Sequence, residues 1–153
     1  KAFFIDQEIK FRKDFKIYIE AACGLVCLFC GKPQEAMYWW NDVLNKTSEQ
    51  VELRSQGAVR LYLMMLHYED GGIEIMDYLA QQTKTFLKQI TMWHRPEKLF
   101  VKELNSITFI SNKKEKNERF IKLVEELNEI PLSISGNAIN RFVINWLRQK
   151  IVL

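Results

Sequence analysis

The chain is poor in turn-forming residues and in cysteine. It holds three prolines and six glycines among 153 residues, too few for a β-sandwich with a turn after every short strand. Its three cysteines are an odd number and lie together at positions 23, 27 and 30. This pattern excludes a disulfide framework and favours a reducing compartment. We therefore expect a cytoplasmic protein.

Long apolar runs and a strong net charge are also missing. The longest apolar run, 21–30, is about half of what a membrane-spanning helix needs. The net charge is only +3, and acidic residues interrupt the basic ones, so we expect neither a membrane nor a nucleic acid as partner. No signal peptide is present. Because Lys1 already lies in helix-like sequence, we expect the chain to be a piece of a longer protein.

Catalytic and cofactor-binding motifs are missing as well. The sequence has no P-loop, no dinucleotide-binding fingerprint, no HExxH and no GxSxG. His67 stands near Glu69 and Asp70, but no nucleophile or orienting group is recognisable beside it. We interpret His67 as a residue that caps a helix end or lies on the surface. The sequence predicts no enzyme, no catalytic residue and no cofactor.

The three cysteines lie on one side of a predicted helix, at i, i+4 and i+7. A zinc site would need a fourth ligand, and both histidines are far along the chain. Every neighbour of the cysteines is apolar, and buried thiols commonly fill protein cores. We therefore expect reduced, buried cysteines and no metal.

Hydrophobic residues make up 48% of the chain, and their spacing is that of helices. The pattern predicts an all-α domain, 1–153, with about seven helices and no strand. Glycine and proline divide these helices into antiparallel hairpins, over about 14–45, 48–91 and 96–130. A last amphipathic helix, about 137–150, carries Ile139, Phe142, Val143, Trp146 and Leu147 on one face. We expect it to cap the open side of the last hairpin.

The first hairpin is the clearest. Gly31 follows the apolar run as a left-handed helix stop, and Pro33 opens the second helix. Gly24 and Ala36 are small residues that predict a close approach of the two helices. The first helix is apolar almost all round, so we expect neighbours on both sides. Trp40 is expected in the core, and Trp39 against the neighbouring unit.

The segment 17–48 resembles a tetratricopeptide (TPR) repeat of the divergent bacterial type. The matching positions are the small or turn residues Gly24, Gly31 and Ala36, followed by Trp40 and Val43. Two positions depart from the family, where Glu20 replaces its tryptophan and Ser48 its closing proline. Gly31 and Gly71 lie 40 residues apart, more than the usual period of about 34, so HEAT-type geometry stays open.

The resemblance implies a short right-handed α-solenoid whose first helices line a concave groove for a protein or peptide. Matched to the family, the groove positions of the first two hairpins are Tyr18, Ala21, Leu25, Leu28, Ala58, Leu61, Met65 and Tyr68. These side chains are aliphatic and aromatic rather than basic. The sequence thus predicts a non-enzymatic scaffold that binds a protein partner.

Two alternatives remain at this point. The domain could be the regulatory or sensor part of a larger protein with a DNA-binding or catalytic module upstream. It could also be a self-association module that forms a homodimer.

Overall fold

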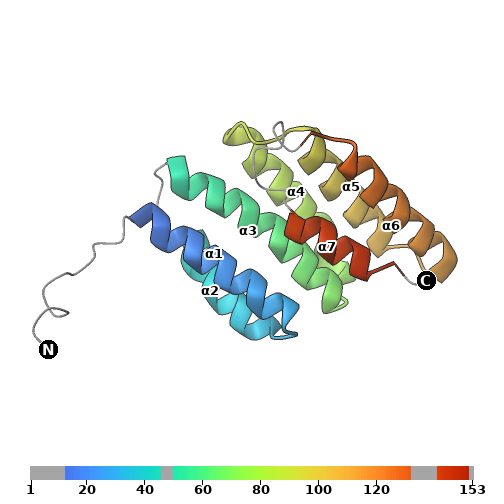
Figure 1. The fold of residues 1–153 in the computed structure, drawn as a ribbon, viewed down its shortest axis with the longest axis horizontal. Coiled ribbons are helices and arrows are strands. Elements are labelled where there is room, and N and C mark those ends of the chain that lie inside the picture. Colours follow the sequence, from blue (N-terminus) through green and yellow to red (C-terminus); the bar gives the residue numbers. More distant parts are fainter. Residues whose placement is uncertain (1–12, 46–49, 132–140, 152–153) are drawn as a thin grey trace, which may run out of the picture.

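A computed structural model describes residues 13–45, 50–131 and 141–151. Over these ranges the chain forms seven α-helices and no strand, which confirms the all-α prediction (Figure 1). The helices are α1 (Lys13–Phe29), α2 (Pro33–Asn45), α3 (Gln50–Glu69), α4 (Ile73–Gln89), α5 (Arg95–Thr108), α6 (Lys113–Asn128) and α7 (Arg141–Gln149). The bounds agree with the predicted hairpins to within a few residues.

The first six helices form three consecutive pairs that stand side by side (Figure 1). α1 packs on α2, α3 on α4, and α5 on α6. The pairs are joined in a regular way, because α2 contacts α3 and α4 contacts α5. α3 stands at the centre and touches α1, α2, α4 and α5. Because of this central position, the side chains of α3 that do not point toward these four helices also lie near the middle of the molecule.

The turn after α1 is made by a glycine in the left-handed conformation. Gly31 has φ +70°, and its N–H donates to the carbonyl of Leu28 at 3.0 Å. The next N–H, of Lys32, reaches the carbonyl of Cys27 at 2.9 Å. These two bonds form a Schellman motif, which satisfies carbonyls at the end of the helix. Gly71 ends α3 in the same way, so the predicted glycine stops are confirmed.

A third helix ends in this motif without a glycine. After α4, Thr91 has φ +57° and donates to the carbonyl of Lys88 at 3.2 Å, while Met92 donates to Leu87 at 2.8 Å. A β-branched residue with positive φ is unusual, because its Cβ crowds the backbone. The turn between α4 and α5 is therefore strained at one residue.

Trp40 of α2 determines how the first pair packs. Its side chain is fully buried, and its indole Nε1 donates to the carbonyl of Ala21 in α1 at 3.1 Å. A Cβ on Gly24 would lie 2.1 Å from the same Nε1. The sequence predicted that Gly24 and Ala36 make room for two backbones. In the structure Gly24 makes room for the indole ring of Trp40.

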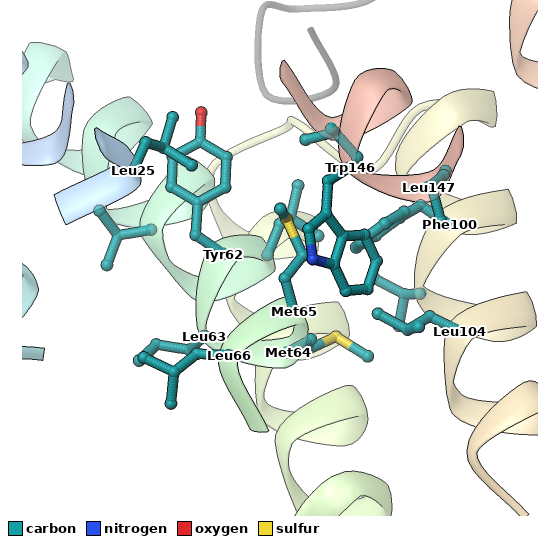
Figure 2. Packing of buried hydrophobic residues seen from close by; sticks show 14 of the residues in the cluster. Leu25, Tyr62, Leu63, Met64, Met65, Leu66, Phe100, Leu104, Trp146 and Leu147 are labelled. Carbon is teal, nitrogen blue, oxygen red and sulfur yellow. The ribbon is translucent and has the colours of Figure 1, made fainter. Parts of the chain in front are cut away.

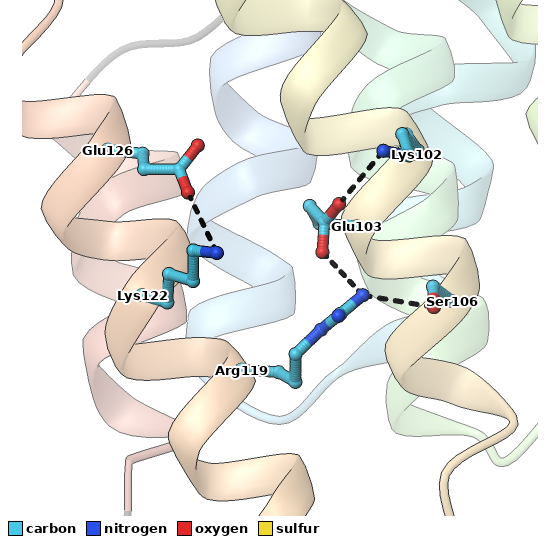
Figure 3. A network of polar contacts seen from close by, with 6 residues as sticks. All are labelled: Lys102, Glu103, Ser106, Arg119, Lys122 and Glu126. Carbon is cyan, nitrogen blue, oxygen red and sulfur yellow. Dashed lines mark hydrogen bonds and ion pairs between the residues drawn. The ribbon is translucent and has the colours of Figure 1, made fainter.

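Polar contacts cross the last pair of helices on its solvent side. Arg119 of α6 pairs with Glu103 of α5 at 2.7 Å and donates to Ser106 at 3.2 Å (Figure 3). Lys102 lies 3.7 Å from the same carboxylate. The Arg119–Glu103 pair is partly buried, whereas Lys102 is exposed and its pair contributes little to stability. The contacts of Arg119 join α6 to α5 on this side.

α1 differs from the prediction on its outer side. The sequence predicted neighbours all round, but Val26 is 61% exposed and Tyr18 is 51% exposed, with Ile19 exposed beside them. The reason is position: α1 stands at the end of the row, and among the described helices α2 and α3 are the ones that pack on it.

A glycine-to-alanine exchange tests the fit of Trp40. Gly24→Ala should lower the free energy of unfolding by roughly 1–3 kcal/mol, because overpacking against the rigid indole outweighs the better helix propensity of alanine. Urea denaturation measures the change. Gly57→Ala is the matched control, since its Cβ would meet the ends of two flexible side chains, Leu87 and Ile90, at 2.9 and 3.1 Å. Equal effects of the two exchanges would contradict the assigned packing.

The strained turn predicts a stabilising exchange. Thr91→Gly should raise the free energy of unfolding by about 1 kcal/mol, because relief of the left-handed conformation exceeds the entropy that glycine adds to the unfolded chain. The urea midpoint should rise at an unchanged slope. The reverse exchange at an equivalent turn, Gly31→Thr, should lower the midpoint. A Thr91→Gly protein with the parental midpoint would show that the turn carries no strain.

Candidate partner-binding face

α7 returns to the middle of the molecule after α6. In Figure 1 it lies in front of α3, between α1 and α6. It packs along α6, and the ring of Phe142 reaches Phe29 of α1, with 6.4 Å between centroids. The last helix thus touches the first pair as well as the last. The sequence predicted a cap on the open side of the last hairpin only.

The buried side of α7 follows from its sequence. Val143, Ile144, Trp146 and Leu147 are buried, whereas Arg141, Asn145 and Arg148 are exposed. Val143, Trp146 and Leu147 were predicted to be covered, and the polar face was predicted to be solvated. Phe142 was predicted to be covered but is 56% exposed, and Ile144 takes part instead. Ile139 lies outside the described residues.

Trp146 attaches α7 to α3. Its indole Nε1 donates to Glu69 Oε1 at 2.7 Å, and its side chain is almost fully buried. Trp146 and Leu147 belong to the same buried cluster as Met65 of α3 and Phe100 and Leu104 of α5 (Figure 2). A buried indole requires an acceptor for its N–H. Glu69 supplies that acceptor at the last residue of α3.

Tyr68, next to Glu69, holds Trp146 from a second direction. Its ring stands at 87° to that of Trp146, with 5.7 Å between centroids. It also stands at 87° to Phe120 of α6, at 5.6 Å. Such edge-to-face pairs add about 0.5–1.5 kcal/mol beyond burial. Burial, assisted by the Glu69 carboxylate, raises the pKa of Tyr68 above its usual value, so the phenol is neutral at physiological pH.

A lysine completes the contact. Lys150 forms an ion pair with Glu69, and its Nζ lies 5.3 Å from the centre of the Trp146 ring. Glu69 therefore accepts from the indole of Trp146 and from the ammonium group of Lys150, which directly follows the last residue of α7. The segment in this position thus presents to Glu69 an indole N–H and, four residues later, a cation.

The groove positions predicted from the TPR resemblance fall mostly in the core. Tyr18 is exposed, and Ala58 and Tyr68 are half-buried. The buried positions are Ala21, Leu25, Leu28, Leu61 and Met65. α1 packs directly on α3, and α7 covers the face near Tyr68. The groove is therefore closed in this structure, and most of these side chains offer no surface to a partner.

Docking of α7 is favoured by side-chain burial and opposed by a loss of backbone entropy of similar size. Its four buried side chains contribute roughly 1.5–3 kcal/mol each. Ordering its nine residues costs roughly 1–2 kcal/mol of backbone entropy each. The two totals are of similar size, and a helix of this length is not stable alone in water. The contacts of Trp146 and Lys150 with Glu69 thus decide whether α7 stays docked.

A second apolar surface lies on the outer side of the first pair. A shallow cleft of about 290 Å³ is lined by Lys16, Ile19, Glu20 and Trp39. Trp39 is half-buried and packs edge-to-face on Tyr38 at 5.8 Å, so it borders this surface. It was predicted to pack on a neighbouring unit.

A third feature is a cleft of about 420 Å³ between the end of α6 and α7. Its floor is apolar and its rim is polar, with Leu127, Asn128, Ile130, Arg141, Ile144, Asn145 and Arg148 around it. It lies on the solvent side of α7, away from Glu69.

The cysteines correct one prediction. They are free thiols, but Cys30 is exposed and Cys23 and Cys27 are half-buried, and Cys27 lies at the edge of the core beside α2. The Sγ of Cys27 lies 3.9 Å from Glu35, whose carboxylate also pairs with Lys32 at 2.8 Å. Partial burial and the Glu35 charge raise the pKa of the Cys27 thiol. Among the described residues, no three His, Cys, Asp or Glu side chains are placed to hold a metal.

Comparisons with known proteins add no family. No protein-family model, curated protein or solved structure matches this chain. In the part of the chain that the structure describes, every helix is too short or too polar to cross a bilayer.

Thiol chemistry should distinguish the cysteines. At neutral pH we expect iodoacetamide to modify Cys27 more slowly than Cys30, because Cys30 is exposed and the raised pKa of Cys27 leaves less thiolate. Peptide mass spectrometry over time measures the two rates. Glu35→Gln should speed modification of Cys27, since it removes a charge that raises the pKa. If the rate at Cys27 stays the same in the variant, the Glu35 contact is absent in solution.

Truncation of two aromatic side chains of α7 should destabilise the protein to different extents. Trp146→Ala should cost at most about 3 kcal/mol, the lower end for a buried aromatic, because the loss cannot exceed the docking free energy of α7. Phe142→Ala should cost about 1 kcal/mol, since its ring is largely exposed and loses one aromatic contact. Urea denaturation followed by circular dichroism compares them. A larger loss for Phe142→Ala would contradict the assigned face.

Proposed function

We propose that this domain is a non-enzymatic module that binds a helical segment of a protein or peptide partner. The partner would lie on the inner face of the helix row, the face that α7 covers. The observation that supports this is α7 itself: an amphipathic helix from the end of the chain is bound there through its apolar side. A face that accepts one such helix has the shape and the chemistry to accept another.

We further propose that the three pairs are TPR-like units of a short right-handed α-solenoid. The second helix of one pair contacts the first helix of the next, as α2 contacts α3 and α4 contacts α5. α6 contacts α7 in the same manner, and the first helices α1, α3 and α5 contact each other in order. This order of neighbours is what stacked helical hairpins require.

The proposal is tested with helical peptides selected from a display library against the full chain. One variant, Ala58→Arg, alters the inner face. A second, Val26→Lys, alters the outer side of α1. Selected peptides should bind at least tenfold more weakly to Ala58→Arg and equally well to Val26→Lys. Peptides that lose binding only with Val26→Lys would assign partner binding to the outer side instead.

Self-association is a second candidate, because the outer side of α1 exposes Ile19 and Val26 together. Single exposed apolar residues are common, but a stripe along one helix at the end of a row is typical of an interface. Sedimentation of the full chain would then show a concentration-dependent dimer that Val26→Lys dissociates. A monomer at all concentrations excludes this candidate.

A further inference from the structure

We propose that α7 is a displaceable internal occupant of the partner-binding face, and that the partner is an amphipathic helix that replaces it. The inference rests on the proposed function and adds the chemistry of the partner and the regulation of access to the face. In the absence of a partner the chain covers its own binding site. Binding then requires that α7 leave α3.

The attachment of α7 supports displacement. α7 has nine residues, whereas the other helices have 13 to 20. More than half of its residues are exposed. Its polar contacts to α3 converge on a single side chain, Glu69, from Trp146 and Lys150. A segment held by few side chains belongs to the part of a fold that opens first.

The same contacts define which helix can replace α7. Val143, Trp146, Leu147 and Lys150 stand at i, i+3, i+4 and i+7, so they lie on one side of a helix. The aliphatic pair and the indole enter the apolar cluster, and the indole N–H and the ammonium group reach Glu69. A competing helix therefore needs two aliphatic residues, a tryptophan and a lysine or arginine in this spacing. An acidic helix would be repelled by Glu69.

Displacement would expose the part of the predicted groove that α7 covers. Trp146 covers Tyr68 directly and lies in one cluster with Met65. Both are positions that the TPR resemblance assigns to partner contact. The apparent affinity of the partner is then lower than its intrinsic affinity by the fraction of molecules with α7 open. Any change that loosens α7 should strengthen binding without altering the face.

The probe is a fluorescent peptide with the chain's own sequence 137–151. It is titrated into the full chain with Trp146→Ala, which weakens α7 but leaves α3 intact. Asn145→Ala is the matched control, because Asn145 is exposed on the opposite side of α7. We expect the peptide to bind the Trp146→Ala chain at least tenfold more tightly than the control chain. A peptide that itself carries Trp146→Ala should not bind. Equal affinity of the two chains would overturn the proposal.

Hydrogen exchange on the unaltered chain keeps the proposal testable if the variant does not fold. Amides of 143–149 should exchange at least tenfold faster than those of 61–66 in α3, and saturating peptide should speed them further. Equal protection of α7 and α3 would overturn the proposal. A dimer of the unaltered chain that Trp146→Ala dissociates would also overturn it, because a second copy's α7 would then be the occupant.

The two hypotheses fail in different ways. If library peptides bind the inner face while α7 keeps its full protection, the proposed function stands and displacement is wrong. If α7 opens but no peptide depends on the inner face, α7 is a mobile helix and the proposed function is wrong.

Discussion

The contact of Trp146 with Glu69 connects the last described helix to the centre of this fold. Without it α7 would be a short amphipathic helix beside α6, and the ring of Tyr68 would lose the indole that packs on it. Three demands coincide at this one place. The indole N–H needs an acceptor, the Glu69 carboxylate needs a donor and a cation, and the ring of Tyr68 needs aromatic neighbours. Trp146 and Lys150 meet these demands from more than seventy positions away in the sequence.

A second constraint acts at the other end, where Trp40 occupies the space left by Gly24. Together the two tryptophans set the framework. Trp40 fixes the first pair, and Trp146 fixes the last helix against the middle pair. α3 lies between them and contacts both halves, and it supplies more buried hydrophobic residues than any other described helix. The outer side of α1 takes no part in this framework, which explains why its apolar residues are exposed.

The helices and two of the turns could be predicted from sequence because they depend on local signals. Apolar residues at helical spacing and the glycines at 31 and 71 mark them directly. Thr91 could not be recognised as a turn residue, because threonine rarely adopts positive φ and the motif is imposed by the packing of α4 and α5. Burial was harder to predict. The cysteines and Val26 lie in an apolar stretch of sequence. Their exposure nevertheless depends on α1 being the outermost of the described helices.

The candidate face depends on contacts that no local sequence pattern shows. The eight groove positions do lie on α1 and α3, but a periodic pattern cannot tell whether another segment already covers them. The apolar stripe of α7 was visible in the sequence, whereas its target was not, since nothing local relates Trp146 to Glu69. A capping helix and a bound helix have the same amphipathic pattern and differ only in where they dock.

The most direct test of α7 as the occupant is the indole N–H signal of Trp146 in a nitrogen-15 correlation spectrum. In the unaltered chain it should show through-space contacts to the Tyr68 ring. On addition of excess 137–151 peptide, it should move to the position of a free indole, while the Trp40 signal stays in place. A Trp146 signal without contact to Tyr68, or one that moves together with that of Trp40, would contradict the occupied and exchangeable inner face.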